Sequence, residues 1–271
     1  MNTTVNGVRI AYHDRGRRHD TVLLLIHGFP LDHRMWAPQL IGLSVHARVI
    51  APDLRGFGRS EVTPGPLTME QHADDLAALL DHLAVERAVV AGLSMGGYIA
   101  FAFWRRHRER AQALVLLDTR AEPDSPQAKA NRDAAAAKVR KAGAAAIANE
   151  MLPRLLAPAS LSNRRIADRA LTMMAEQPVE GVAGALAGLR DRADSRPTLP
   201  TINVPALVLV GEQDALTPPA DAALMAAAIP GARLVVVPRA GHLSPLENPR
   251  AVNRALRDFL AGDLNAVPRT T

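Results

Sequence analysis

The stretch Gly92-Leu93-Ser94-Met95-Gly96-Gly97 decides the fold of this 271-residue chain. It follows the apolar run Arg87–Ala91 and precedes a helix-forming stretch, Tyr98–His107. A strand, a sharp G-x-S-x-G turn and a helix form a nucleophile elbow, which lifts a serine hydroxyl above the edge of a sheet. Its glycines lack the side chains that would collide in so tight a turn. The sequence therefore predicts Ser94 as a nucleophile and the N–H of Met95, at the start of the helix, as an oxyanion donor.

Two further polar residues follow strands later in the chain. Asp214 comes a few residues after the apolar run Ala206–Val210, and His242 comes at a similar distance after Arg233–Val237. Because open α/β sheets place their sites at the carboxyl ends of strands, we expect both side chains to meet Ser94. The chain order Ser, Asp, His is the order that this kind of elbow requires. His242 would accept the serine proton, and Asp214 would orient the ring and stabilise the imidazolium.

Each of these assignments has an alternative. The elbow residues alone also fit a glycine-rich turn with a solvated serine, and Asp214 could be an ordinary turn residue. Asp118 ends a strand as well and could serve as the acid, although its position before a long helical segment also suits a role in bracing a hinge.

The second oxyanion donor is expected in the loop after the strand Thr21–Ile26. In its segment His27-Gly28-Phe29-Pro30, the N–H of Phe29 is predicted as this donor. We interpret His27 of that segment as a structural residue that holds the loop in place.

The chain alternates short apolar strands with amphipathic helices. An Asn6-Gly7 turn joins two strand-like runs in a predicted hairpin. Further strands are expected at Thr21–Ile26, Arg48–Ala51, Arg87–Ala91, Ala113–Leu117, Ala206–Val210 and Arg233–Val237, and helices at Trp36–Leu43, Leu67–Leu83, Tyr98–His107 and Pro249–Leu260. This alternation predicts an α/β fold with a mostly parallel central sheet and helices on both of its faces.

Residues 119–201 interrupt this alternation because they contain no convincing strand. Helices are predicted at Ala134–Ala148 and Arg164–Met174, with several prolines between and after them. At about 80 residues the segment is too long for an ordinary crossover, which favours a helical cap inserted after the sixth strand. The predicted units are one discontinuous core (1–118 and 202–262), a cap or lid (119–201) and a disordered tail (263–271).

Composition narrows the classes of function. The chain contains no cysteine, which excludes disulfides, thiolate zinc sites and cysteine nucleophiles, and no metal or cofactor is predicted. The first residues carry no secretory signal pattern, and no apolar run approaches the roughly 20 residues of a membrane span. We therefore expect a cytoplasmic protein without a membrane partner.

The net charge of +5 comes from arginines scattered along the chain, and aromatic residues are few. This pattern argues against nucleic-acid binding. The sequence leaves both a monomer and a homodimer open.

Five stretches of the sequence resemble the α/β-hydrolase fold family. They are HGFPLDHRMW (27–36), PDLRGFGRS (52–60), GLSMGG (92–97), GEQDALTPP (211–219) and AGHLSPLENP (240–249). The chain looks most like small bacterial esterases, 3-oxoadipate enol-lactonases and cofactor-free haloperoxidase-like hydrolases. This resemblance implies a structural turn at Asp53, Arg55 and Gly58. Dehalogenases and epoxide hydrolases of this fold use an aspartate nucleophile, and hydroxynitrile lyases need a pocket lysine. The serine at 94 and the absence of a lysine near any motif argue against these activities.

We expect the chain to hydrolyse small carboxylic esters or lactones through an acyl-enzyme intermediate. One alternative is an enol-lactonase, in which Arg154 or Arg165 would reach the carboxylate of the substrate. A second is a perhydrolase, in which hydrogen peroxide replaces water, and a third is a non-catalytic ligand-binding protein on the same fold. The side chains predicted to line the substrate pocket are Trp36, Leu152, Leu155, Met173, Met174 and Leu243.

Overall fold

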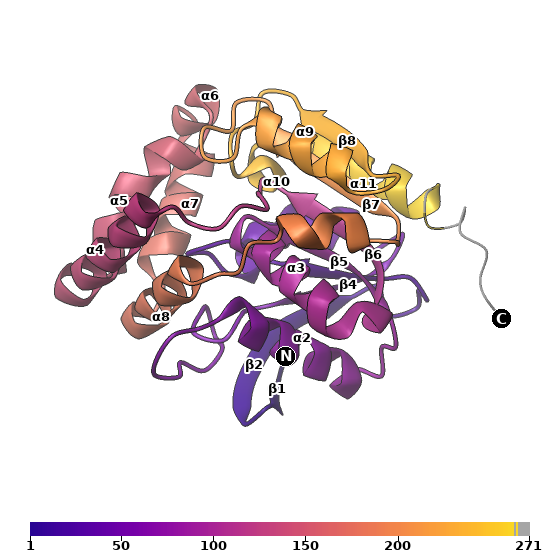
Figure 1. Ribbon diagram of the computed structural model, residues 1–271, viewed down its shortest axis with the longest axis horizontal. Helices are drawn as coiled ribbons and strands as arrows, with labels where there is room; N and C mark the ends of the chain where they lie inside the picture. Colours follow the sequence, from indigo (N-terminus) through magenta and orange to yellow (C-terminus); the bar gives the residue numbers. More distant parts are fainter. Residues whose placement is uncertain (263, 265–271) are drawn as a thin grey trace.

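The computed structural model describes residues 1–262 and Leu264, so the predicted disorder of 263–271 concerns residues that, Leu264 apart, lie outside the described part. Within that part, the strands form one eight-stranded sheet in the order β1-β2-β4-β3-β5-β6-β7-β8 (Figure 1). The strands are β1 (Asn2–Val5), β2 (Val8–Arg15), β3 (Val22–Ile26), β4 (Arg48–Pro52), β5 (Ala88–Leu93), β6 (Ala111–Leu117), β7 (Ala206–Gly211) and β8 (Arg233–Val237). Only β1 with β2 and β2 with β4 pair antiparallel. The predicted α/β fold with a mostly parallel sheet is confirmed.

The central strands are apolar throughout because both of their faces are covered. Every residue of β3, β5 and β7 is buried, as expected for parallel strands between two layers of helices. At the edge of the sheet β8 instead alternates, and it leaves Leu234 and Val236 partly exposed. The hydrophobic pattern of each strand therefore follows from its place in the sheet.

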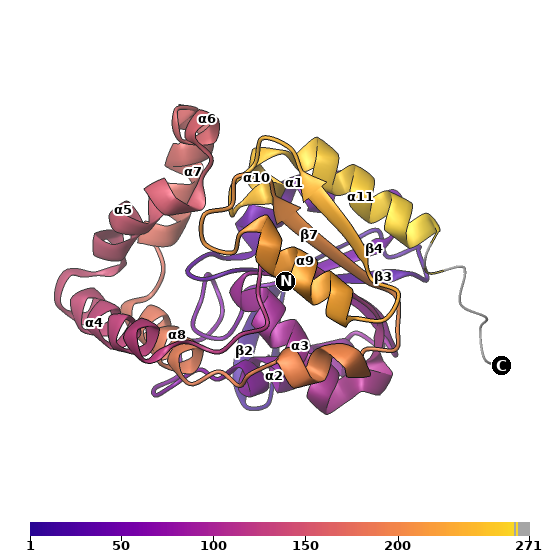
Figure 2. The same ribbon diagram turned by 45° about the horizontal axis from the view of Figure 1, so that its top comes forward.

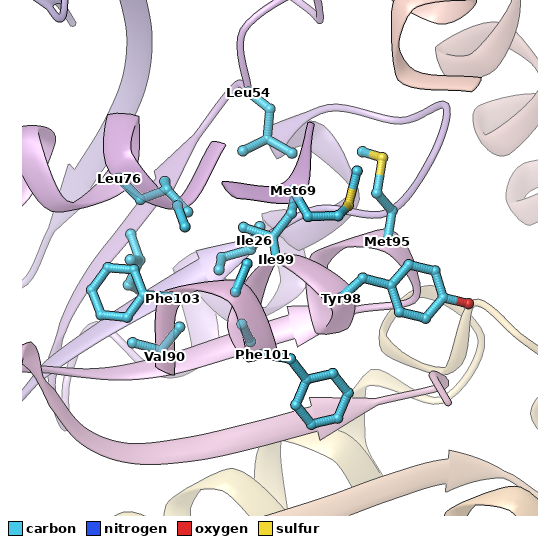
Figure 3. Packing of buried hydrophobic residues seen from close by; sticks show 14 of the residues in the cluster. Ile26, Leu54, Met69, Leu76, Val90, Met95, Tyr98, Ile99, Phe101 and Phe103 are labelled. Atoms are coloured by element: carbon cyan, nitrogen blue, oxygen red, sulfur yellow. The ribbon is translucent and has the colours of Figure 1, made fainter. Parts of the chain in front are cut away.

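Helices cover the sheet on both faces, and a separate group stands to one side. Outside that group the helices are α1 (Ala37–Gly42), α2 (Met69–His82), α3 (Met95–His107), α9 (Pro219–Ala228), α10 (Ser244–Glu247) and α11 (Pro249–Ala261), with 3₁₀ turns η1 (His33–Trp36), η2 (Arg108–Arg110) and η3 (Arg196–Thr201). The apolar faces of α2, α3 and α9 share one core cluster with the sheet, and those of α1 and α11 share the other. Figure 3 shows the first cluster around α3, which includes Met95, Tyr98 and Ile99 of α3 and Met69 of α2. Within the described residues, no helix has the length and apolar character needed to cross a bilayer.

Between β6 and β7 the chain forms the inserted helices, which lie together at one side of the sheet (Figures 1 and 2). They are α4 (Pro126–Ala142), α5 (Ala144–Leu155), α6 (Pro158–Leu161), α7 (Arg164–Ala175) and α8 (Val179–Arg190). As predicted, residues 119–201 contain no strand. The prediction of a single helix over 134–148 is wrong, because α4 ends and α5 begins within that range. Gly143 ends α4, because its φ of 79° lies outside the helical region and is readily adopted by glycine. That the inserted helices form a separate cap unit stays a prediction.

The parallel register brings the carboxyl ends of the strands to one edge of the sheet. Ile26 pairs with Gly92, Leu93 pairs with Leu117, and Leu117 pairs with Leu209. The loops that follow β3, β5, β7 and β8 therefore start side by side. These are the loops that carry the residues predicted to act together.

Candidate active site

Ser94 sits in a strained turn between β5 and α3. Its backbone has φ 55° and ψ −112°, a region that residues with a side chain rarely adopt. A Cβ at Gly92 would lie 2.0 Å from the carbonyl oxygen of Gly96, so the turn closes only with glycine there. The Thr119 hydroxyl donates to the Ser94 carbonyl at 2.8 Å, and the Ser94 N–H donates to Leu117 at 2.9 Å. These contacts hold the serine in its strained conformation.

The structure brings the three predicted polar residues together at the edge of the sheet. Nε2 of His242 lies 2.8 Å from Oγ of Ser94, and Nδ1 of the same ring lies 2.8 Å from Oδ2 of Asp214. Asp214 and His242 are each 3% exposed, so water scarcely competes for these hydrogen bonds. A serine hydroxyl, a ring that can accept its proton and a carboxylate that orients the ring are thus aligned.

The surroundings of Asp214 keep its carboxylate ionised. Burial favours the neutral acid, but the hydrogen bond from His242 and those from Thr217 outweigh it and hold the pKa of Asp214 below its usual range. Oδ1 accepts from the N–H groups of Leu216 (2.8 Å) and Thr217 (3.0 Å), and Oδ2 accepts from the Thr217 hydroxyl (2.7 Å). An ionised carboxylate can only accept, so Nδ1 of His242 carries the proton. The other ring nitrogen is left to accept from Ser94.

Asp118, the alternative acid, faces other partners. Its Oδ1 accepts from the Gly211 N–H at 2.7 Å, and its Oδ2 accepts from the Ser244 hydroxyl at 2.5 Å. Burial and then the nearby charge of Asp214 raise the pKa of the Asp118 carboxyl well above its usual value. The ring of His242 therefore bonds to Asp214, and Asp118 ties the end of β7 to the start of α10.

Phe29 and Met95 are the residues predicted to supply the two oxyanion donors. Both line the cavity beside Ser94, and neither N–H has an acceptor within the described residues. The Phe29 loop is held by His27, whose Nε2 accepts from the Leu54 N–H at 3.0 Å and whose Nδ1 lies 2.9 Å from the Gly28 carbonyl. Burial lowers the pKa of His27, which keeps the ring neutral and able to accept. The loop geometry agrees with a structural role for His27.

The cavity over Ser94 has a volume of about 520 Å³, which lies in the range of drug-sized ligand sites. Its floor comes from the loops that follow the strands and from the start of α3, and its walls come from α4, α5 and α8. Of the six side chains predicted for the pocket, Leu155 lines this cavity. The prediction is wrong for the other five, which do not line it: Trp36, Leu152, Met173, Met174 and Leu243. They pack in the hydrophobic cluster on the α1 and α11 face of the sheet, and Met173 also borders a separate cleft.

Sequence reasoning missed several cavity residues. Tyr98 lies four residues after Ser94 on α3, and this helical spacing was the available signal for its place in the cavity. The buried guanidinium of Arg192 stacks over the Tyr98 ring at 4.4 Å and pairs with Asp124 at 2.5 Å.

Of the two arginines considered for an enol-lactonase, Arg154 lines the cavity and has no hydrogen-bond or ion-pair partner among the residues that the structure describes. Arg165, the other arginine considered, does not line it.

The turn after β4 has a structural role, in agreement with the implied one. Asp53 accepts from the His33 ring at 2.6 Å and from the Arg59 N–H at 3.0 Å. Gly58 has a φ of 54°, and a Cβ there would lie 2.5 Å from the Asp53 carboxylate. Arg55 forms two hydrogen bonds of 2.7 Å to Asp75 of α2. The turn is thus held by buried charges.

One cluster of described residues, Asp32, His33 and Asp53, brings three possible metal ligands within 4.8 Å of one another. Both carboxylates are already engaged. Asp32 pairs with Arg34 at 2.7 Å and accepts from Gln177 at 2.9 Å, and Asp53 pairs with His33. These contacts already occupy both carboxylates, and the cluster does not line the cavity over Ser94. The cluster fits an ion-paired structural junction.

Comparison with known proteins gives consistent matches over most of the chain. A family model described as alpha/beta hydrolase fold matches residues 21–249. The 3-oxoadipate enol-lactonase 2 of Acinetobacter baylyi is 31% identical over 254 residues, which cover 93% of each chain. The structure of a thermophilic esterase from Thermogutta terrifontis, with malate bound, is 47% identical with a TM-score of 0.92 and covers 96% of both chains. The enol-lactonase from Burkholderia xenovorans is 35% identical with a TM-score of 0.90, covering 96% of this chain and 100% of that one.

Proposed function

The chain belongs to the α/β-hydrolase fold family, and from this premise we propose that it is a serine hydrolase of small carboxylic esters or lactones. The observation that carries the proposal is the line of 2.8 Å hydrogen bonds from Ser94 through His242 to Asp214. Proteins named as an esterase and as enol-lactonases are among its relatives, and they support this class of substrate.

The proposed reaction begins with attack by Oγ of Ser94 on the carbonyl carbon. Nε2 of His242 takes the serine proton as the new bond forms, and the ionised Asp214 stabilises the imidazolium. The carbonyl oxygen becomes an oxyanion that accepts from the N–H groups of Phe29 and Met95. A donor of this kind typically contributes about 3 kcal/mol of transition-state stabilisation. The helix dipole of α3 adds to it, because Met95 is the first residue of that helix.

An acyl-enzyme on Ser94 then forms and is hydrolysed. The tetrahedral intermediate collapses, the ester C–O bond breaks, and His242 returns its proton to the leaving alcohol. A water molecule next gives its proton to His242 and attacks the acyl carbon, and the second collapse releases the carboxylic acid. The serine regains its proton from His242. For a lactone, the alcohol and the acid leave as one molecule.

The test compares hydrolysis of p-nitrophenyl acetate and butyrate by the wild type, Ser94→Ala and Ser162→Ala. Ser162 is an exposed serine after α6 and serves as the matched control. We expect the wild type and Ser162→Ala to turn over at the same rate. We expect Ser94→Ala to lose at least about 10³-fold in kcat. Full activity in Ser94→Ala would reject the assigned nucleophile, and an inactive wild type would reject the hydrolase.

A second candidate, a lactonase for substrates that carry a carboxylate, is favoured by Arg154. This arginine lines the cavity without a partner among the described residues, so its charge is available to an anionic substrate. We expect Arg154→Gln to raise the KM for an anionic lactone about tenfold or more, because one charge-assisted hydrogen bond is lost. The KM for a neutral aryl ester would stay constant, and Arg165→Gln serves as the control. Equal effects on both substrates would contradict this candidate.

A further inference from the structure

The carboxylate of Glu247 lies at the junction between the loop that carries His242 and the end of α5. Its Oε1 accepts from the N–H groups of Gly241 (3.0 Å) and Leu243 (3.1 Å), the two neighbours of His242 in the chain. Its Oε2 accepts from the N–H of Ala157 at 2.8 Å, two residues after α5 ends. One side chain thus holds both flanks of the histidine and the end of an inserted helix.

The backbones of the two segments also meet directly. The His242 N–H donates to the Leu155 carbonyl at 2.9 Å. A Cβ at Gly241 would lie 2.6 Å from the backbone nitrogen of Ala157. The histidine loop can therefore pack this closely against Ala157 only because residue 241 is glycine. The side chain of Leu155 lines the same cavity as the ring of His242. The end of α5 therefore contacts the histidine loop on one side and the cavity on the other.

We propose that Glu247 is a positioning residue that clamps the His242 loop onto the end of α5, so that the placement of the imidazole depends on how the inserted helices are seated. The effect of the clamp on hydrolysis rests on the proposed function, whereas the clamp itself is a property of the fold. The ring must stay within hydrogen-bond reach of Ser94 and Asp214 at once. A shift of about 1 Å in such a group can cost about 10²-fold in rate.

Two substitutions remove the clamp from opposite ends. In Glu247→Gln the side chain keeps one accepting oxygen, so it can serve the histidine loop or Ala157 but not both. Ala157→Pro removes the N–H that donates to Glu247, and the backbone suits it: Ala157 has φ −59° and the preceding Leu156 has ψ 143°. Glu109→Gln is the matched control, because Glu109 is an exposed glutamate on η2.

Hydrogen exchange measured by mass spectrometry tests the clamp without any substrate. In Ala157→Pro we expect faster exchange in the peptide 239–247, which contains no substituted residue, at a melting temperature that shows the chain to be folded. Glu247→Gln should give the same result, and Glu109→Gln should exchange as the wild type does. Unchanged exchange of this peptide in folded Ala157→Pro would overturn the proposal, whether or not the protein hydrolyses esters.

Steady-state kinetics with p-nitrophenyl acetate test the positioning role. We expect Glu247→Gln and Ala157→Pro each to lower kcat about 10- to 100-fold with KM within about threefold. The double variant should lose little more than either single variant, because both substitutions break the same contact. A kcat within twofold of the wild type in folded Glu247→Gln, or fully additive losses, would overturn the proposal. An inactive wild type would instead refute the proposed function and leave hydrogen exchange to decide on the clamp.

Discussion

His72 makes the folded chain sensitive to acid. The side chain lies on the buried face of α2 with 0% exposure, and neither ring nitrogen has a hydrogen-bond partner among the described residues. Burial, with smaller contributions from the neighbouring His27 and Arg55, lowers the pKa of His72 to about 3 from its usual 6.5. The folded protein therefore keeps this ring neutral at a pH where the unfolded chain protonates it.

The sign and size of the effect follow from proton linkage. Because the pKa of His72 is lower in the folded state, its contribution to stability is complete above pH 6.5 and is lost as the pH falls towards 3. Each pH unit within this window costs about 1.4 kcal/mol. Between pH 7 and pH 4.5 the wild type should lose about 3 kcal/mol of unfolding free energy through this residue alone.

Urea unfolding of the wild type and His72→Leu at several pH values isolates the contribution of His72 to the unfolding free energy. The carboxylates and the other histidines titrate in both proteins, so the difference between their unfolding free energies reports on residue 72. We expect the advantage of His72→Leu over the wild type to grow by about 3 kcal/mol between pH 7 and pH 4.5. A difference that stays constant within about 0.5 kcal/mol over this range would refute the reasoning.

Two further predictions concern the site. Asp118→Ala leaves two buried donors unpaired and should lower the unfolding free energy by about 2–4 kcal/mol in urea titrations. Asp118→Asn can still accept from the Gly211 N–H and can donate its amide N–H to the Ser244 oxygen, so it should cost less than half of that. Thr217→Val removes the hydroxyl that donates to Asp214 and should lower kcat about tenfold; an unchanged kcat would show that this bond does not hold the carboxylate.

The sequence alone was enough to predict those features whose signal lies within a few neighbouring residues. The elbow around Ser94 needs glycines at fixed neighbouring positions, so its pattern is visible in six residues. Asp214 and His242 could be predicted because each follows an apolar strand, and parallel strands bring their carboxyl ends to one edge. The break between α4 and α5 was also visible in principle, since Gly143 follows the basic last turn of a helix.

The cavity walls could not be predicted in the same way. Met151 of α5 lines the cavity while Met174 of α7 lies in the core, although both are apolar residues of inserted helices. Which helix face meets the cavity depends on how the inserted helices pack on one another and on the sheet, and hydrophobic spacing does not encode that. The contact between Glu247 and Ala157 spans 90 residues and joins a side chain to a backbone N–H, so no local sequence pattern predicts it.

The most direct test of the central claim is to map the site that a fluorophosphonate probe modifies. Inhibition by the probe should follow the appearance of a single adduct, and peptide mass spectrometry should locate this adduct on Ser94. Ser94→Ala should remain unlabelled under the same conditions. An adduct on another residue, or ester hydrolysis that persists in fully labelled protein, would contradict the account.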